Sequence, residues 1–374
     1  MLSRIWVAAG IAALVFAAAA QGGAPPVGAR AFIVENPATG EILAQRGAWT
    51  RVPIASITKL MTVLVTLDHA KWNDVVRVGP AAAEVGESTI NLRRGETITV
   101  GDLIKAALIQ SANDAAEALA YYVGKGDRAA FIAMMNAKAK VLGLERTHFL
   151  TPDGLDTAGH YSTAFDVTKL AQIAMRNPRV RATVRLRTDA IAGGRRLHTW
   201  NDLLGVFRGV YGVKTGHTGE AGWCEVAAVR RYGVTLYTTV LGSRTRSQRN
   251  ADLASLMRWG LGVYRPTWLV RTRHVYLRAA VGYGKAAVPI LATAPLVRRV
   301  RTDRPLVERV IAPSVLDLPV KRGERVGEIR VYSGKRLVAR RMLVAGRSVT
   351  RPGLAGRLGF YAGRTFHHIG SWFT

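Results

Sequence analysis

The stretch IASITKLMTVLVTL, residues 54–67, constrains the fold most strongly, because it is apolar enough for a buried helix yet has a lysine near its start. Helix N-termini carry partial positive charge and favour acidic residues. The usual capping pattern places Glu or Gln three residues after a capping Ser or Thr. Here Lys59 takes that position, three residues after Ser56. The lysine therefore needs a reason other than helix stability.

A catalytic role for Lys59 supplies such a reason. Residues three apart on a helix share a face, so the amine can reach the Ser56 hydroxyl. Burial and the helix terminus both disfavour the ammonium and lower the lysine pKa. A neutral amine can take the proton of Ser56, which then attacks a carbonyl. Taken alone, S-x-x-K is short and common, and a capping serine beside a solvated lysine is its ordinary interpretation.

A second motif, Ser111-Ala112-Asn113, lies at a polar break between two helices predicted within residues 96–124. Ser, Asn and Asp cap helices, and Asn113 or Asp114 could serve only as a cap. The functional interpretation makes Ser111 a proton relay beside Lys59. Asn113 would then hold a substrate amide.

A third motif, Lys214-Thr215-Gly216, lies in a β-like run just before a hairpin predicted at 223–243. A strand glycine often marks the close approach of another backbone, and an extended peptide can add to a strand edge. Lys214 would supply positive potential, and Thr215 could hydrogen-bond a carboxylate. An exposed edge strand carrying a lysine is the ordinary alternative.

Together, in the order S-x-x-K, S-x-N and K-T-G, the motifs resemble those of the penicillin-binding serine acyl enzymes. The chain is most similar to the low-molecular-mass D-alanyl-D-alanine carboxypeptidases, over about residues 29–264. The phrases that carry this closer likeness are IASITKLMT, LIQSANDAAEALA, THFLTPDGLD, YSTAFDVTKLA and GVKTGHTGEAGW.

The resemblance implies a role for each matching residue. Ser56 is the nucleophile, Lys59 its general base and Ser111 a proton relay, while Asn113 orients the substrate. The substrate end is bound by Lys214, Thr215 and Gly216, and the backbone N–H groups of Ser56 and His217 form the oxyanion hole.

The implied substrate is the peptidoglycan pentapeptide stem that ends in D-Ala-D-Ala. Its last peptide bond is attacked, D-alanine leaves, and water hydrolyses the acyl-enzyme. β-Lactams mimic this substrate and are implied covalent inhibitors of Ser56. Neither a metal nor an organic cofactor is implied.

The chain departs from the family pattern upstream of K-T-G. The family usually has an Asn-x-Asn phrase there, sometimes with an arginine that faces the terminal carboxylate. This chain has LHTWNDLL, with Trp200 in that region. Arg249 is a candidate substitute, and a surface arginine in an arginine-rich chain is the alternative.

The expected fold is an α/β (α+β) catalytic domain of the β-lactamase/transpeptidase type, with an antiparallel sheet flanked by helices. After Pro266, short β-rich runs alternate with turns, which predicts a small all-β domain. The predicted organisation is a signal peptide at 1–20, a catalytic domain at 21–265, an all-β domain at 266–350 and an amphipathic tail at 351–374.

The N-terminal residues predict export. Arg4 precedes an apolar stretch and a run of small residues, which is typical of a signal peptide cleaved before Gln21; an uncleaved membrane anchor is the alternative. Cys224 is the single cysteine, so no intrachain disulfide can form and a Cys-rich zinc site is excluded. These features favour the periplasmic face of the bacterial inner membrane, with peripheral attachment.

The charge points to an anionic partner. The chain has a net charge of +28, and residues 266–374 hold 21 basic against 5 acidic side chains. Such a protein could bind nucleic acid, anionic lipid or acidic wall polymer, but export and the lack of a recognition motif argue against nucleic acid. The tail predicts a helix that lies in an anionic membrane surface, or else docks on its own protein. Its apolar face is Leu354, Leu358, Tyr361, Ile369 and Trp372, and its cations are Arg357, Arg364 and His367.

Two other functions remain open. A serine β-lactamase would share Ser56, Lys59 and K-T-G but needs a deacylation base, often a loop glutamate. Between Asn113 and Lys214 the glutamates are Glu117, within a predicted helix, and Glu145. A non-catalytic envelope-binding protein with the same fold is the second alternative, and the intact motifs argue against it.

Overall fold

A computed structural model describes residues 13–16 and 23–361 of the chain. The described residues divide into two compact units, residues 23–262 and a second unit that combines residues 263–361 with residues 13–16. Each unit has its own cluster of buried apolar side chains. The chain therefore forms two separate cores.

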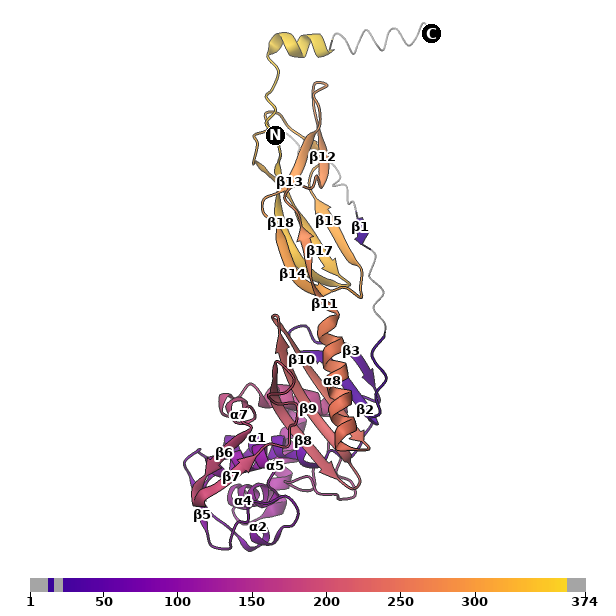
Figure 1. Cartoon of the computed structure of the whole chain (residues 1–374). Coiled ribbons are helices and arrows are strands. Elements are labelled where there is room, and N and C mark those ends of the chain that lie inside the picture. Colours follow the sequence, from indigo (N-terminus) through magenta and orange to yellow (C-terminus); the bar gives the residue numbers. More distant parts are fainter. Residues whose placement is uncertain (1–12, 17–22, 362–374) are drawn as a thin grey trace. The chain divides into compact units, whose positions relative to one another are not determined.

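A five-stranded antiparallel sheet forms the centre of the first unit, in the order β3-β2-β10-β9-β8 (Figure 1). The strands are β2 (Ala31–Asn36), β3 (Glu41–Arg46), β8 (Val210–Thr218), β9 (Gly222–Arg231) and β10 (Val234–Ser243). The hairpin predicted at 223–243 is β9-β10, and β2 and β3 form a second antiparallel pair. Strand β8, which carries Lys214-Thr215-Gly216, lies at an edge of the sheet.

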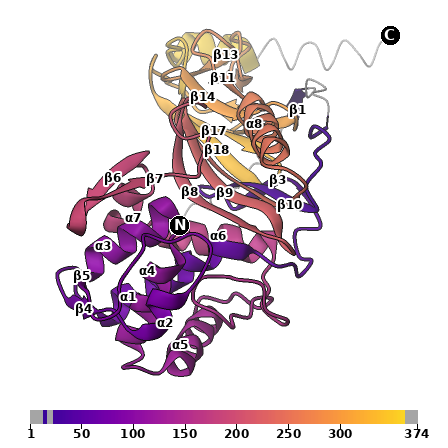
Figure 2. The same cartoon turned by 60° about the horizontal axis from the view of Figure 1, so that its bottom comes forward.

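Helices cover both faces of this sheet (Figure 2). Helix α8 (Arg246–Gly262) packs against β9 and β10, and α6 (Ala164–Ala174) packs against β2, β9 and β10. Helix α1 (Lys59–His69) contacts α4, α5 and α6. The other elements are β4 (Val75–Arg77), α2 (Pro80–Glu84), β5 (Thr97–Thr99), α3 (Val100–Lys105), α4 (Asn113–Val123), α5 (Arg128–Val141), α7 (Pro178–Thr183), β6 (Thr188–Ile191) and β7 (Arg195–His198). This arrangement is the expected α+β class.

Local sequence rules account for several helix starts in this unit, although α1, α2 and α4 have no side-chain cap. The Thr163 side chain accepts a hydrogen bond from Asp166 N and caps α6. Neither Asn113 nor Asp114 caps α4, which begins after Ala112 without a side-chain cap. Asp114 instead accepts hydrogen bonds from Ile90 N and Leu92 N, so its carboxylate anchors a neighbouring loop.

The second unit is a β structure built from a seven-stranded sheet and a two-stranded sheet. Its strands are β11 (Tyr264–Val270), β12 (Leu277–Val281), β13 (Val288–Ala292), β14 (Leu296–Arg301), β15 (Leu306–Ile311), β16 (Val315–Leu316), β17 (Arg325–Ser333) and β18 (Arg336–Ala345). The expected boundary at 265/266 falls inside β11, because Tyr264 and Arg265 already pair with β14. Of the predicted signal peptide, Ala13–Phe16 form β1, which pairs with β15, and the rest lies outside the described residues.

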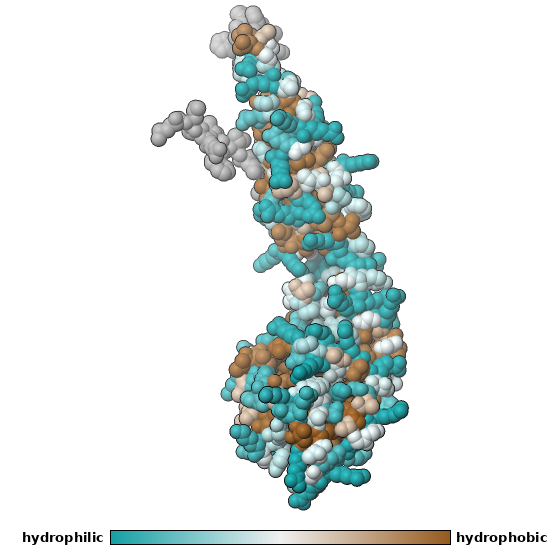
Figure 3. Space-filling view, turned by 90° about the vertical axis from the view of Figure 1, so that its left-hand side faces the viewer, coloured by the Kyte–Doolittle hydropathy of each residue, from teal (hydrophilic) through white to brown (hydrophobic). Residues whose placement is uncertain are grey.

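The described part of the tail forms a helix over residues 354–361. Leu354 is 78% exposed, Leu358 70% and Tyr361 56%, so this apolar face is open to solvent. Ile369, Trp372, Arg364 and His367 lie outside the described residues. Within residues 13–16 and 23–361, no helix is both long and apolar enough to cross a bilayer. Hydrophilic side chains cover much of the face in Figure 3, as the net charge predicts.

Candidate active site

A short 3-10 turn, Ala55–Thr58, holds Ser56 at the entrance to α1. Ala55 has φ +49°, a left-handed conformation that costs free energy for a residue with a side chain. Gly154 packs so closely here that a Cβ on it would lie 2.0 Å from the Ala55 carbonyl oxygen. The turn is therefore fixed by tight backbone packing, which holds the Ser56 hydroxyl in place.

The Lys59 ammonium has three close acceptors. Its Nζ lies 2.7 Å from Ser56 Oγ, 2.7 Å from Asn113 Oδ1 and 2.8 Å from the Asp153 carbonyl oxygen. The side chain is fully buried. A lysine Nζ carries three donor positions, so these contacts fix the amine in space. The predicted proximity of Ser56 and Lys59 is therefore present.

Burial lowers the pKa of Lys59 from 10.5 to about 8. The charges of Asp153 and Glu87 raise this pKa but do not offset the loss of hydration. At pH 7 about one lysine in ten is then neutral and can accept a proton. The direction agrees with the sequence-based expectation.

Ser111 pairs with Lys214. Its hydroxyl accepts a hydrogen bond of 2.8 Å from Lys214 Nζ, which also donates to the Thr215 carbonyl oxygen at 2.9 Å. Ser111 has φ +65° and follows the π-helical turn Ala106–Gln110, an irregularity that directs its side chain away from the helix path. The sequence prediction placed Ser111 beside Lys59, whereas the hydrogen bond in the described structure joins it to the second lysine.

Both the oxygen and the nitrogen of the Asn113 side-chain amide form hydrogen bonds. Its Oδ1 accepts from Lys59, and its Nδ2 donates to the Gly86 carbonyl oxygen at 3.0 Å. One N–H of the amide is left for a further acceptor. This residue links α4, the Lys59 amine and the loop that contains Glu87.

Strand β8 forms one wall of the site. A Cβ on Gly216 would lie 2.8 Å from the Ile54 carbonyl oxygen and 3.0 Å from Ser56 N, so the absence of a side chain permits this approach. Lys214 is 2% exposed, and both burial and the charge of Lys59 lower its pKa well below the usual value. His217 is exposed at the end of the wall, with its ring 4.0 Å from the Trp223 ring, centre to centre.

A cleft of about 180 Å³ brings the three motifs together. The helix entrance, the break before α4 and the edge strand all contribute side chains. The residues that line it are Ser56, Glu87, Ser88, Ser111, Asn113, Trp200, Thr215, Gly216, His217, Trp223 and Arg249. Lys59 and Lys214 lie just behind this lining, each bonded to a serine hydroxyl.

Arg249 reaches the cleft from α8, although it is only 1% exposed. Its guanidinium lies 3.1 Å from Glu225 Oε2 and 3.0 Å from Asp202 Oδ2. The Trp223 ring centre is 5.7 Å from Cζ, within cation–π range. The alternative of an ordinary surface arginine is therefore wrong, because the side chain is buried and held by two carboxylates.

Sequence reasoning missed several residues of this site. Glu225 is fully buried on β9, where burial raises its pKa to about 7 against the pull of Arg249. Glu87 lines the cleft but precedes the segment between Asn113 and Lys214, where a deacylation base was expected. Glu225 stands among apolar residues in the sequence of β9, and this unusual position could have indicated a functional role.

The two glutamates weighed for β-lactamase chemistry do not line the cleft. Glu117 lies within α4 and pairs with Arg128 through a 2.9 Å contact. Glu145 is exposed in the loop after α5. Among the described residues, no group of His, Cys, Asp and Glu has a geometry that could hold a metal ion.

A family model and a curated relative both identify the same protein family for this chain. The model of the peptidase S11 family, D-alanyl-D-alanine carboxypeptidase, matches residues 18–245. D-alanyl-D-alanine carboxypeptidase DacC of Escherichia coli is 32% identical over 368 residues, which cover 94% of this chain and 92% of the relative.

Solved structures are similar as well. The crystal structure of D-alanyl-D-alanine carboxypeptidase DacD from Francisella tularensis covers 89% of this chain and 96% of its own, with a TM-score of 0.65 at 24% identity, and so supports the fold. Penicillin-binding protein D2 from Listeria monocytogenes, solved in its cefotaxime-bound form, covers 64% of this chain and 100% of its own. It has a TM-score of 0.59 and 33% identity.

Proposed function

The chain belongs to the D-alanyl-D-alanine carboxypeptidase family of serine peptidases, and from this premise and the site geometry we propose that Ser56 is its acylated nucleophile. The reaction is removal of the terminal D-alanine from a peptidoglycan stem peptide. The observation that carries the proposal is the 2.7 Å contact between Lys59 Nζ and Ser56 Oγ, inside a cleft walled by β8.

Acylation begins when neutral Lys59 accepts the Ser56 proton. The serine oxygen forms a bond to the penultimate carbonyl carbon, and the bond from that carbon to the D-alanine nitrogen breaks. Lys59 returns the proton to the departing amine, with Ser111 as the relay. The 2.8 Å bond from Lys214 orients the Ser111 hydroxyl.

The wall strand binds the substrate as an added strand. An extended peptide pairs with the free edge of β8 through main-chain hydrogen bonds. The backbone N–H groups of Ser56 and His217 stabilise the developing oxyanion. The close packing of Gly216 on Ser56 N supports this donor pair, and the remaining N–H of Asn113 binds a substrate carbonyl.

The terminal carboxylate of the substrate is bound at the end of the cleft where Thr215 and Arg249 lie. Thr215 donates its hydroxyl, and Lys214 and Arg249 supply positive potential. Because Arg249 is fixed by Glu225 and Asp202, it acts from a preorganised position without moving on binding.

Water completes the cycle by hydrolysing the ester at Ser56, with Lys59 again taking a proton. A β-lactam acylates the same oxygen and leaves an ester that this site hydrolyses slowly. Labelled penicillin should therefore remain bound for minutes, whereas rapid turnover of nitrocefin would favour the serine β-lactamase alternative.

An enzyme that acts on peptidoglycan must be located in the cell envelope, where this substrate is found. The predicted signal peptide and the exposed apolar face of Leu354, Leu358 and Tyr361 support a peripheral position on the periplasmic side of an anionic membrane. No nucleic acid partner and no cofactor enters the proposal.

The test is D-alanine release from a disaccharide pentapeptide, followed by mass spectrometry of the products. The purified protein should release one D-alanine per stem, and Ser56→Ala should release none while it keeps the thermal unfolding midpoint of the wild type. Unchanged release by a folded Ser56→Ala protein would refute the proposal and leave the non-catalytic alternative or another site.

A further inference from the structure

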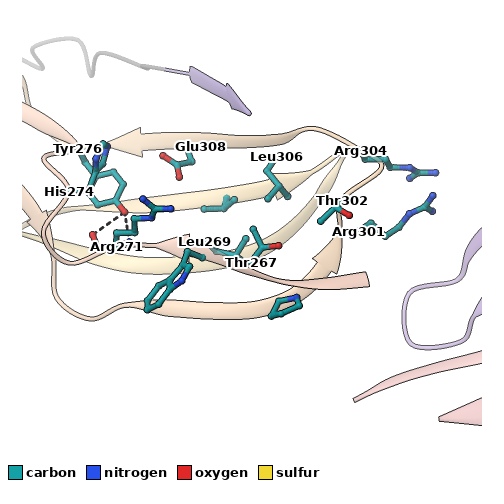
Figure 4. Close-up of a pocket in the computed structure, with 13 residues that line it drawn as sticks. Thr267, Leu269, Arg271, His274, Tyr276, Arg301, Thr302, Arg304, Leu306 and Glu308 are labelled. Atoms are coloured by element: carbon teal, nitrogen blue, oxygen red, sulfur yellow. Dashed lines mark hydrogen bonds between the residues drawn. The ribbon is translucent and has the colours of Figure 1, made fainter. Parts of the chain in front are cut away.

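A sizeable cavity lies in the second unit. It measures about 490 Å³, against about 180 Å³ for the active-site cleft. It lies between the segment that starts with β11 and strands β14, β15 and β17, as Figure 4 shows. The residues that line it are Pro266, Thr267, Trp268, Leu269, Arg271, His274, Tyr276, Arg301, Thr302, Arg304, Leu306, Glu308 and Val331.

Glu308 is the residue that makes this cavity unusual. Strand β15 alternates strictly, and Leu306, Glu308 and Val310 share its inward face. Glu308 is only 8% exposed, yet its carboxylate has no hydrogen bond or ion pair within the described part of the chain. Burial raises its pKa. A buried carboxylate without a donor is costly, so its retention on an inward strand face indicates a ligand.

Figure 4 shows Glu308 pointing from β15 into the cavity, with Arg271 on the facing segment. Arg271 is held by its main chain, since Arg271 N donates to Tyr276 Oη at 2.8 Å and Tyr276 Oη donates to the Arg271 carbonyl oxygen at 3.2 Å. Its guanidinium forms no ion pair with any described residue. Its positive charge is close enough to lower the pKa of Glu308.

The cavity thus offers an unpaired anion and an unpaired cation across one space. Leu269, Leu306 and Val331 supply an apolar floor near them. A simple cation is disfavoured by the net positive charge of the unit, and a simple anion is repelled by Glu308. A ligand that carries an ammonium and a carboxylate together satisfies both groups.

We propose that this cavity binds a free α-amino-acid group that bears an apolar side arm. The ammonium pairs with Glu308, the carboxylate pairs with Arg271, and the side arm lies on the apolar floor. The site is separate from the serine chemistry, because all its lining residues belong to the second unit.

The test is isothermal titration calorimetry of the full chain with L-leucine as the probe. N-acetylleucine lacks the ammonium and leucine methyl ester lacks the carboxylate. We expect leucine to bind and each derivative to bind about tenfold or more weakly, because each loses one charge-assisted contact. Leucine should bind equally well after the active site is treated with benzylpenicillin.

Amino-acid substitutions distinguish specific binding at this site from a general effect of the unit's charge. Glu308→Gln and Arg271→Gln should each weaken leucine binding about tenfold. Asp317→Asn, a surface substitution of the same type in the same unit, should leave it unchanged. Arg271 is exposed, so its variant tests the site even if Glu308→Gln fails to fold. Absence of leucine binding, equal binding of the derivatives, or binding of N-acetylglucosamine in place of leucine would overturn the proposal.

Discussion

Lys59 Nζ lies 2.7 Å from Ser56 Oγ, and the same amine is tied to Asn113 and to the main chain at Asp153. The lysine that is poorly placed for helix stability is therefore well placed as a base. Its burial leaves it partly neutral near neutral pH, which is the state that proton abstraction requires.

Acylation should accelerate with pH because Lys59 must lose a proton. With its pKa at about 8, the neutral fraction, and with it the acylation rate, rises about tenfold between pH 7 and pH 9. The measurement is the second-order rate of labelling by fluorescent penicillin across this range. Lys59→Arg keeps the positive charge but cannot serve as a base, so its rate should be very low and nearly flat. A wild-type rate that does not change from pH 7 to pH 9 would exclude Lys59 as the base.

Arg249 should control preference for a free terminal carboxylate. Arg249→Gln removes the buried cation at the cleft, and we expect kcat/KM for a peptide acid to fall about 100-fold, as for a lost charge-assisted contact in a dry site. The same substitution should affect the matching peptide amide much less. Arg258→Gln, an exposed arginine on the same helix, is the control and should change neither. Equal losses for acid and amide would assign Arg249 a purely structural role.

His160 should make the fold sensitive to acid. Its ring accepts from Leu150 N at Nδ1 and contacts Thr58 Oγ1 through Nε2 at 2.9 Å, and burial lowers its pKa from 6.5 to about 4. Because the folded protein resists protonation, the contribution to stability is full above pH 6.5 and is lost as pH falls towards 4. The loss is up to about 3 kcal/mol.

Urea unfolding at pH 7 and pH 4.5 measures this effect of His160. His160→Gln should reduce the difference in unfolding free energy between the two pH values, and His69→Gln, at an exposed position, should not. If the pH difference is the same in wild type and His160→Gln, the buried ring is not responsible.

Removal of the tail should release the protein from membranes without loss of activity. Leu354 and Leu358 are largely exposed, and Tyr361 contacts the ring of Tyr283 in the second unit. None of the three belongs to either core, so deletion after Arg351 leaves both cores intact. Flotation with vesicles that contain anionic lipid should show binding of the full chain and weaker binding to neutral vesicles. A truncated protein that floats as well as the full chain would contradict the anchor.

Much of the site was predictable because its chemistry depends on short local spacing. Ser56 and Lys59 are three residues apart, and Lys214-Thr215-Gly216 lie on one strand, so periodicity alone places each group. The partners of these groups come from distant segments. The Asp153 carbonyl and the pairing of Ser111 with Lys214 depend on packing that no local pattern encodes.

For the second unit, the sequence predicted the all-β class but not the pairing of its strands. Residues 306–311 alternate clearly, whereas β13 contains a proline and β14 contains three arginines, which weakens the local strand pattern. Glu308 occupies an inward position that alternation alone assigns to an apolar residue. Its burial became evident only when the register of β15 with β17 was known.

The central claim, that Ser56 forms the acyl-enzyme, is tested most directly by peptide mapping after brief exposure to benzylpenicillin. Tandem mass spectrometry should find one penicilloyl group per chain, on the peptide that contains Ser56, and none on Ser56→Ala. An adduct on Ser111 or elsewhere, or no adduct on a folded wild-type protein, would contradict the account.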